Sequence, residues 1–270
     1  MPIPIYQIDA FTSRPFGGNP AAICLLDDWL PDATLQAIAQ ENNLSETAFI
    51  VPSGPDYALR WFTPTVEVDL CGHATLATAY LILERLQPES SGVAFETRSG
   101  TLTVRRSGDG RLTMDFPVLP VGEAMTPPSD LLQAMGRAPL ATYRIREQHG
   151  APYYLMHYAS QSEVAALAPT FAALAGNVIA TAEGDADDVD FVSRFFAPMS
   201  GIDEDPVTGS AHCTLTPFWS DRLGKPVLRA QQISARLGEL EVALDGERVL
   251  LTGQCNFYME GRIEVESGLP

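Results

Sequence analysis

Four polar side chains in this sequence have the types and surroundings that proton transfer on a small molecule requires. Glu46 opens an apolar stretch, where a carboxyl group is expected to have a raised pKa and to exchange a proton near neutrality. His73 follows a glycine at the start of an apolar helical segment, where the helix dipole favours a neutral imidazole. Asp205 and Ser210 flank the matching glycine in the second half. The pattern predicts an acid/base site in which Glu46 shuttles the proton.

Each of these residues also has an ordinary structural interpretation. Glu46 could be an exposed carboxylate at a strand end, and His73 a packed, hydrogen-bonded histidine. Ser210 could cap its helix. Asp205 ends an acidic run, Asp203–Asp205, of the kind that is usually a solvated loop. We retain Asp205 from this run because it lies immediately before the approach to the second glycine.

Two glycine motifs open the two apolar helical segments. The first reads Cys-Gly-His-Ala-Thr at 71–75, and the second reads Thr-Gly-Ser-Ala-His at 208–212. Amides of the first helical turn and the helix dipole together favour a carboxylate or a developing oxyanion. These motifs predict binding of a small anionic substrate by residues of both helix starts: Gly72, His73, Ala74, Thr75, Gly209, Ser210 and Ala211.

The elements that must position these groups occur twice along the chain. Phe62-Thr63-Pro64 precedes the first glycine motif, and Phe196-Ala197-Pro198 precedes the second. Further matches downstream keep the two copies 134 to 138 residues apart. Duplication of this kind predicts two similar lobes related by a pseudo-twofold axis, with a cleft where the motifs converge.

The local patterns predict an α+β protein in which strands surround one apolar helix in each lobe. The central helices are expected at 74–83 and at 211–223, the second kinked by Pro217. Other helices are expected at 32–41, 131–135 and 161–175, and a proline-rich linker at 117–128. The predicted lobes are residues 1–118 and 119–270, and the C-terminal segment could pack back on the first lobe.

The acid/base group is expected in one copy only. Depending on the frame, Ala175 or a position near Glu183 corresponds to Glu46 in the second half. Thr208 corresponds to Cys71, and threonine does not ionise near neutral pH, so a mechanism with two opposed thiols is excluded and Cys71 is expected to be a small buried residue. One ionisable shuttle favours proton transfer on a single face of the substrate over inversion of a stereocentre.

Composition and cysteine use narrow the class of protein. A net charge of −17 disfavours binding to nucleic acid or to an anionic membrane. No apolar run reaches the length of a membrane span, and the N-terminus lacks the features of a secretory signal. Four widely spaced cysteines fit a reduced, cytoplasmic protein. Cys71 with His73, and His212 with Cys213, lack the usual spacing of metal ligands, so no metal is expected.

The ordered motifs resemble the phenazine-biosynthesis PhzF-like family. They are Gly17-Gly18-Asn19-Pro20, Leu44-Ser45-Glu46-Thr47, the first glycine motif, and Asp205-Pro206-Val207-Thr208-Gly209-Ser210-Ala211-His212. The resemblance implies the diaminopimelate-epimerase-like fold, with two lobes that are each a β-barrel-like sheet around a central helix. It also implies an active site between the lobes, a homodimer, and a reaction without a cofactor.

The same resemblance assigns roles to particular residues. Glu46 is implied to be the acid/base, while His73, Asp205 and Ser210 hold polar groups of the substrate, and Asn19 is a further ligand contact. The expected function is a cofactor-independent isomerase or epimerase acting on a small carboxylate-bearing molecule. The alternatives are a binding or scaffold protein that keeps the site without turnover, and a hydrolase using Cys71 or Ser210. The second glycine of a G-x-S-x-G motif is missing around Ser210, which disfavours hydrolysis.

Overall fold

The computed structural model describes residues 2–148 and 151–265 and divides the chain into two compact units. Unit 1 comprises Met1–Asp115 and Thr252–Pro270, and unit 2 comprises Phe116–Leu251. The boundary predicted from the sequence was after residue 118, and the predicted ranges ended at residues 1 and 270. Both of those ends lie outside the described residues.

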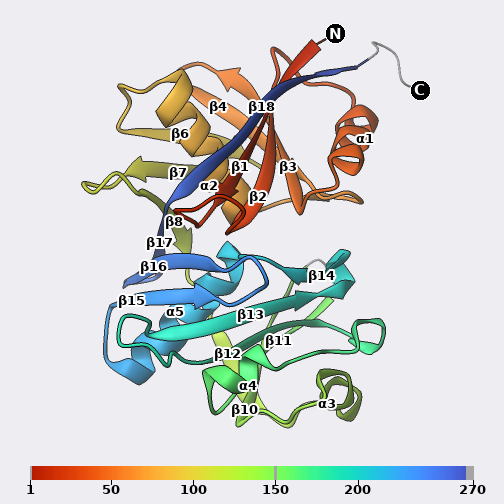
Figure 1. The fold of residues 1–270 in the computed structure, drawn as a ribbon, viewed down its shortest axis with the longest axis vertical. Coiled ribbons are helices and arrows are strands. Elements are labelled where there is room, and N and C mark those ends of the chain that lie inside the picture. The colour runs from red at the N-terminus through yellow and green to blue at the C-terminus, as the bar shows by residue number, and fades with distance from the viewer. Residues whose placement is uncertain (1, 149–150, 266–270) are drawn as a thin grey trace. The chain divides into compact units, whose positions relative to one another are not determined.

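Unit 1 is built on a mixed sheet whose strands are neighbours in the order β18, β1, β2, β3, β4, β6, β7 and β8 (Figure 1). The pairs β2–β3 and β4–β6 are parallel, the other pairs are antiparallel, and the short β5 pairs with β4. The strands are β1 (Pro2–Ala10), β2 (Asn19–Leu25), β3 (Glu46–Ser53), β4 (Asp56–Phe62), β5 (Glu67–Val68), β6 (Gly92–Thr97), β7 (Gly100–Arg106), β8 (Leu112–Pro117) and β18 (Cys255–Glu264).

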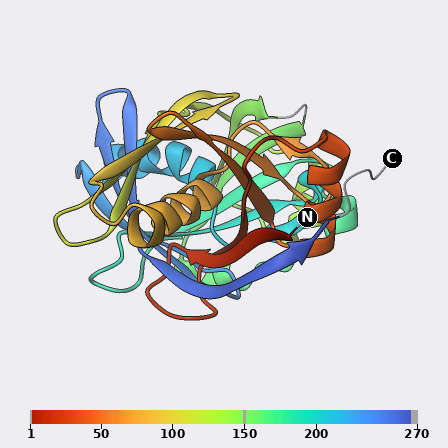
Figure 2. The same cartoon turned by 90° about the horizontal axis from the view of Figure 1, so that it is seen from above.

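Helix α2 (Gly72–Leu81) is the predicted buried helix of unit 1. Every residue in it is buried except the half-buried Tyr80, because the sequence GHATLATAYL has no charged side and its small residues allow close packing. The helix packs against β1, β2 and β3, beside which it lies in Figure 2. It begins at Gly72, two residues before the predicted start, and a π-helical turn, η1 (Ile82–Leu86), follows it.

Helix α1 (Asp32–Asn42) belongs to a second apolar layer of unit 1. Leu35, Ile38 and Ala39 of this helix pack with alternate residues of the sheet, among them Cys24 and Phe49. Neighbouring residues of a strand point to opposite faces, so strands with both faces covered are apolar along their length. The run from Ala48 to Val51 is accordingly buried at every position.

Unit 2 repeats the pairing pattern of unit 1. Its strands are neighbours in the order β9, β10, β11, β12, β13, β15 and β16, with parallel pairs β11–β12 and β13–β15 and with β14 beside β13. The strands are β9 (Val121–Met125), β10 (Ala141–Gln148), β11 (Ala151–His157), β12 (Asn177–Glu183), β13 (Phe191–Ala197), β14 (Ile202–Asp205), β15 (Val227–Gln232), β16 (Gly238–Asp245) and β17 (Arg248–Gly253), which crosses into unit 1. The pattern confirms the internal duplication and the α+β class. Closure of either sheet into a barrel stays a prediction.

Helix α5 (Gly209–Leu223) is the counterpart of α2 and runs through Pro217 without ending. Proline lacks an N–H, which leaves the carbonyl of Cys213 without its helical donor. The backbone amide of Leu119 donates to this carbonyl at 3.1 Å, so the missing bond is replaced from outside the helix. At 15 residues α5 is too short to span a bilayer, and among the described residues no helix is long and apolar enough to do so.

Two expectations for unit 2 were wrong. The helix expected at 161–175 is only α4 (Gln161–Ala165), and a 3-10 turn, η2 (Phe171–Ala173), follows it. Pro169 lies between the two segments, and proline disfavours helical backbone in the residue before it. The linker expected at 117–128 contains β9, which pairs with β10. The short helix predicted at 131–135 is confirmed as α3 (Ser129–Met135).

Candidate functional site

The acid/base candidate of unit 1 lies at the start of a strand beside the start of α2. Glu46 is the first residue of β3 and pairs with Ala21 of β2. Its side chain is 14% exposed. Asn19, two residues before Ala21, shares the face of the sheet that Ala21 occupies, because side chains alternate along a strand. The sheet register therefore brings Asn19 and Glu46 to one face.

The His73 imidazole lies between these two side chains. Its Nε2 is 3.2 Å from Oε2 of Glu46, and its Nδ1 is 3.1 Å from Nδ2 of Asn19. His73 and Asn19 are both buried. Three predicted site residues that are far apart in sequence therefore meet in unit 1, and each ring nitrogen of the histidine faces a different partner.

The histidine is neutral. Burial lowers the pKa of His73 from 6.5 to about 3. The contact with Glu46 is therefore that of a neutral ring with a carboxyl group, although its distance would also suit an ion pair. The contact does not meet the geometry of a formed hydrogen bond, and catalytic hydrogen bonds commonly align only in the Michaelis complex. The lowered pKa agrees with the predicted neutral imidazole, and burial is its cause.

Cys71 is buried, as expected, and its Sγ lies 3.5 Å from His73 Nδ1. Ligand atoms of Glu46, Cys71 and His73 all lie within 4.8 Å of one another, a spacing that a metal ion could bridge. The thiol and the carboxyl group are next to opposite ring nitrogens, however, and one ion binds only one nitrogen of an imidazole. The arrangement suits hydrogen bonding better than metal binding. A reaction without a metal or cofactor stays a prediction.

The start of α2 offers backbone donors next to His73. The first helical bond in α2 runs from the Thr75 amide to the Cys71 carbonyl, which the Thr75 hydroxyl also approaches as a donor. The amides of Gly72, His73 and Ala74 precede that bond and lie at the positive end of the helix dipole. A carboxylate or an enolate oxygen is the group that such amides stabilise.

Unit 2 holds Asp205 in a compact polar cluster. The Thr208 hydroxyl donates to Oδ2 of Asp205, and the Thr208 amide donates to Oε1 of Gln232 at 2.9 Å. The Gln232 amide nitrogen donates to the Asp205 carbonyl at 2.7 Å. All three residues are buried, so the acidic run ends in an anchored carboxylate rather than in a solvated loop. Sequence reasoning missed Gln232, because a glutamine in a strand gives no signal of this role.

Ser210 is the second residue of α5 and is half-buried. The residue at the cap position is Thr208, and its side chain makes no capping bond, so helix capping does not explain Ser210. The amides of Gly209, Ser210 and Ala211 precede the first helical bond, from His212 to Thr208. His212 is buried, and its Nδ1 lies 2.7 Å from the Thr208 carbonyl. That the two motifs serve one active site stays a prediction.

The register of the strands identifies the counterpart of Glu46. Thr47 pairs with Phe62 in unit 1, and Val178 pairs with Phe196 in unit 2. Because Phe62 and Phe196 begin the matched motifs, Glu46 corresponds to Asn177, the first residue of β12. Both assignments considered from the sequence, Ala175 and a position near Glu183, were wrong, since spacing alone does not fix a register. By the same logic Asp205 corresponds to Val68.

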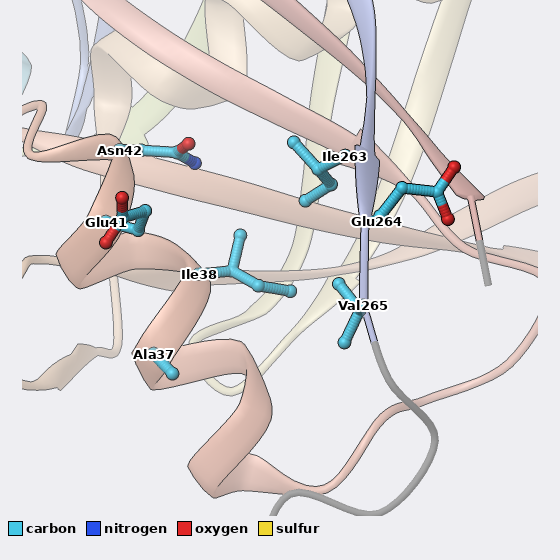
Figure 3. Close-up of a pocket in the computed structure, with 7 residues that line it drawn as sticks. All are labelled: Ala37, Ile38, Glu41, Asn42, Ile263, Glu264 and Val265. Carbon is cyan, nitrogen blue, oxygen red and sulfur yellow. The ribbon is translucent and has the colours of Figure 1, made fainter.

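A groove of about 320 Å³ lies elsewhere in unit 1, between α1 and the end of β18 (Figure 3). Ile38 and Ile263 point toward one another across it, and Glu41 and Glu264 are also among its lining residues. None of the residues that line it is a predicted site residue. The groove lacks the histidine, amide and helix start that surround Glu46, and we assign it no part in the chemistry.

Comparisons with known proteins agree with the motifs. Residues 8–261 match the family described as phenazine biosynthesis-like protein. A protein of Pseudomonas aeruginosa named as an uncharacterized isomerase is 50% identical, and the match covers 98% of this chain and all of that protein. The crystal structure of a PhzF-family protein of Enterococcus faecalis is 40% identical, covers 98% of this chain and 100% of its own, and has a TM-score of 0.89.

A more distant structure extends the likeness of fold. A hydroxyproline epimerase of Agrobacterium vitis, crystallised with trans-4-hydroxy-L-proline, has a TM-score of 0.61 at 12% identity, and the match covers 97% of this chain and 91% of that one. At this identity only the fold is shared. The family match, by contrast, spans nearly the whole sequence and includes both glycine motifs. The chain therefore belongs to the phenazine biosynthesis-like, or PhzF, protein family.

Proposed function

We propose that this protein is an isomerase that moves a proton within a small carboxylate-bearing substrate, with Glu46 as the acid/base. The observation that carries the proposal is the 3.2 Å approach of Glu46 Oε2 to the Nε2 of a buried, neutral histidine. A carboxyl group in this setting is shielded from bulk water and next to a group that does not compete for its proton. The names of full-length relatives, which include isomerases at 42% to 50% identity, support the reaction class.

The proposed reaction is a proton transfer with one shuttle. The Glu46 carboxylate takes a proton from a substrate carbon, so a C–H bond breaks and an O–H bond forms. The electron pair stays on the substrate as an enolate or a delocalised carbanion. Glu46 then returns the same proton to a second carbon, which regenerates the carboxylate and leaves an isomer of the starting molecule. No redox partner or co-substrate is needed for this balance.

The other predicted site residues would bind and polarise the substrate. The amides of Gly72 and Ala74 suit an anionic oxygen, and an enolate has more charge on oxygen than the ground state has. Asp205 and Ser210 are proposed to hold polar groups of the substrate. Asp205 is held by Thr208 and by the backbone bond to Gln232, so its position is fixed before substrate arrives.

The register supports a single shuttle. Asn177 stands where Glu46 would be repeated in the second copy, and an amide does not exchange a proton near neutrality. Inversion of a stereocentre usually uses two acid/base groups on opposite faces. We therefore propose transfer from one carbon to another on a single face of the substrate, rather than epimerisation.

Deuterium incorporation tests the proposal. Small carboxylic acids would be incubated with the wild type in D2O, and exchange and isomerisation would be followed by mass spectrometry. Glu46→Gln is expected to slow both by at least about 10²-fold, the scale of a lost general base. Glu96→Gln is the matched control, since Glu96 is exposed and its carboxylate accepts a hydrogen bond from the Ser53 hydroxyl. Full activity of Glu46→Gln would remove this residue from the mechanism.

The screen also separates catalysis from binding. Acids that bind equally to the wild type and to Glu46→Gln without any exchange would favour a binding or scaffold protein. The homodimer implied by the family resemblance and the cytoplasmic location expected from the cysteines stay predictions. Light scattering at micromolar concentration would determine the oligomeric state.

A further inference from the structure

The His73 ring has a defined neighbour at each nitrogen, and together these neighbours restrict its proton. The amide nitrogen Nδ2 of Asn19 lies 3.1 Å from Nδ1, and the carboxyl oxygen of Glu46 lies 3.2 Å from Nε2. A neutral imidazole has one N–H and one lone pair, so one nitrogen donates and the other accepts. The two neighbours therefore select between two tautomers.

Both neighbours select the same tautomer. An amide nitrogen only donates, so Nδ1 of His73 must accept the bond from Asn19. The Cys71 thiol, 3.5 Å from the same nitrogen, is a weak donor and agrees with this assignment. The single proton is then on Nε2, 3.2 Å from the Glu46 oxygen, and an ionised Glu46 is the acceptor for it once the two groups align. The direction of hydrogen-bond donation is therefore the same along the chain of three residues, from Asn19 to His73 and from His73 toward Glu46.

The fold fixes Asn19 in this position. Asn19 is completely buried and pairs with Ala10 across β1 and β2. The preceding Gly18 has a φ of +61°, and a Cβ there would lie 2.1 Å from the Ala10 carbonyl oxygen, so only glycine fits this entry to the strand. Gly18 of the Gly-Gly-Asn-Pro motif is thus required for the backbone turn that leads into Asn19.

We propose that Asn19 is a positioning residue, which holds His73 as the Nε2–H tautomer so that this N–H orients the Glu46 carboxylate. The inference rests on the proposed function only in taking Glu46 as the acid/base. It gives Asn19 a role other than direct contact with substrate. The histidine then stabilises the charged, proton-accepting form of Glu46 without titrating itself.

Nitrogen-15 NMR of the wild-type protein tests the tautomer without reference to activity. Labelled histidine would be incorporated, and the four histidines would be distinguished by comparison with a His73→Gln sample. At neutral pH the His73 Nδ1 is expected to show the shift of an unprotonated nitrogen and Nε2 that of a protonated one. The reverse pattern, or a protonated pair, would overturn the proposal even if no Asn19 variant folded.

Asn19→Asp tests the dependence on the amide. A carboxylate of the same shape accepts rather than donates, so it would draw the proton to Nδ1 and deprive Glu46 of its donor. We expect the His73 shifts to move accordingly, and kcat for exchange to fall about 10- to 100-fold with KM changed less than threefold. This is the scale found when a supporting group of a metal-bound histidine is removed. Gln36→Glu is the control, since it also replaces an amide donor of unit 1: the half-buried Gln36 side chain donates to the Thr63 carbonyl.

The two proposals fail in different ways. If Asn19→Asp keeps the Nε2–H tautomer and full activity, the role of Asn19 is wrong whatever Glu46 does. If Glu46→Gln keeps full activity while the wild-type tautomer is as expected, the proposed function is wrong. The assignment of Asn19 as donor and His73 Nδ1 as acceptor would still hold. A loss in Gln36→Glu equal to that in Asn19→Asp would show a general effect of added charge and would also overturn the inference.

Discussion

Glu46 and Asn177 occupy equivalent positions in the two units, each as the first residue of a strand that pairs in parallel with the preceding strand. The two copies therefore share this backbone position but differ in the side chain, an ionisable acid in unit 1 and a neutral amide in unit 2. Asn177 is buried, and its Nδ2 donates to the Ser200 hydroxyl at 3.1 Å. The second copy retains a polar group at this position but has no proton to exchange there.

Asn177→Asp should destabilise the protein because it places a carboxyl group where burial disfavours charge. We expect a loss of about 2 kcal/mol in the free energy of unfolding at pH 7. Burial raises the pKa of such a group above its unfolded value, so the penalty should grow as the pH rises from 4 to 7. Urea denaturation at several pH values measures it. Gln254→Glu, at an exposed position outside the helices, should change stability by less than about 0.5 kcal/mol. Equal losses in the two variants would contradict the argument.

The elements of unit 1 were predictable because their apolar patterns are unambiguous. The GHATLATAYL segment has no polar face, and the run from Ala48 to Val51 has no polar residue, so a helix and a strand buried on all sides follow from composition alone. Most elements of unit 2 were harder to predict from the sequence. No strand was predicted at 141–157, where alternation is irregular and tyrosines are frequent, and helical spacing at 161–175 concealed the break at Pro169.

The site was predictable as a set of residue types but not as a set of contacts. The bond between Asn19 and His73 joins residues 54 positions apart, and it depends on how β2 and α2 pack. Gln232 supports Asp205 from a strand that follows α5. Asn177 emerged as the counterpart of Glu46 only from strand pairing, because insertions between the copies shift any fixed offset. The sequence motifs thus indicated which side chains belong to the candidate site, and the strand register and helix packing determined which residues they contact.

Gln232→Met should loosen the support of Asp205. The substitution keeps the length of the side chain but removes the donor to the Asp205 carbonyl and the acceptor for the Thr208 amide. Two buried backbone groups would lose their partners, and we expect a cost of about 2–3 kcal/mol in the free energy of unfolding. Gln231→Met, the half-buried neighbour on the other face of β15, is the matched control and should cost far less. A similar cost in both variants would mean that the loss is general to the strand.

Acid should destabilise the fold partly through His212. Burial lowers the pKa of His212 from 6.5 to about 4, so between these values the unfolded chain binds more protons than the folded protein. The contribution of the neutral histidine is fully present above pH 6.5 and is lost as the pH falls toward 4; at pH 5 the loss is about 2 kcal/mol. The drop in unfolding free energy from pH 7 to pH 5 should therefore be smaller by about this amount in His212→Gln. An unchanged drop would exclude His212 as a source of acid sensitivity.

Tyr153→Phe should not destabilise unit 2, although the residue is almost fully buried. Among the residues that the structure describes, none is hydrogen-bonded to the Tyr153 hydroxyl, and burial near Asp205 and Cys213 raises its pKa well above the usual range. A buried hydroxyl without a partner disfavours folding, so its removal should be neutral or should stabilise by up to about 1 kcal/mol.

Tyr158→Phe provides the contrast for Tyr153→Phe, because the Tyr158 hydroxyl donates to the Arg137 carbonyl at 3.5 Å and lies 3.6 Å from the Met156 sulfur. We expect its loss to cost about 1 kcal/mol, measured for both variants by thermal and urea unfolding. Tyr153 pairs with Asn177, and its ring packs on that of Phe195. A rise in KM without loss of stability in Tyr153→Phe would therefore indicate that the Tyr153 hydroxyl forms a hydrogen bond with the substrate. A destabilisation equal to that of Tyr158→Phe would instead mean that the Tyr153 hydroxyl is satisfied within the fold.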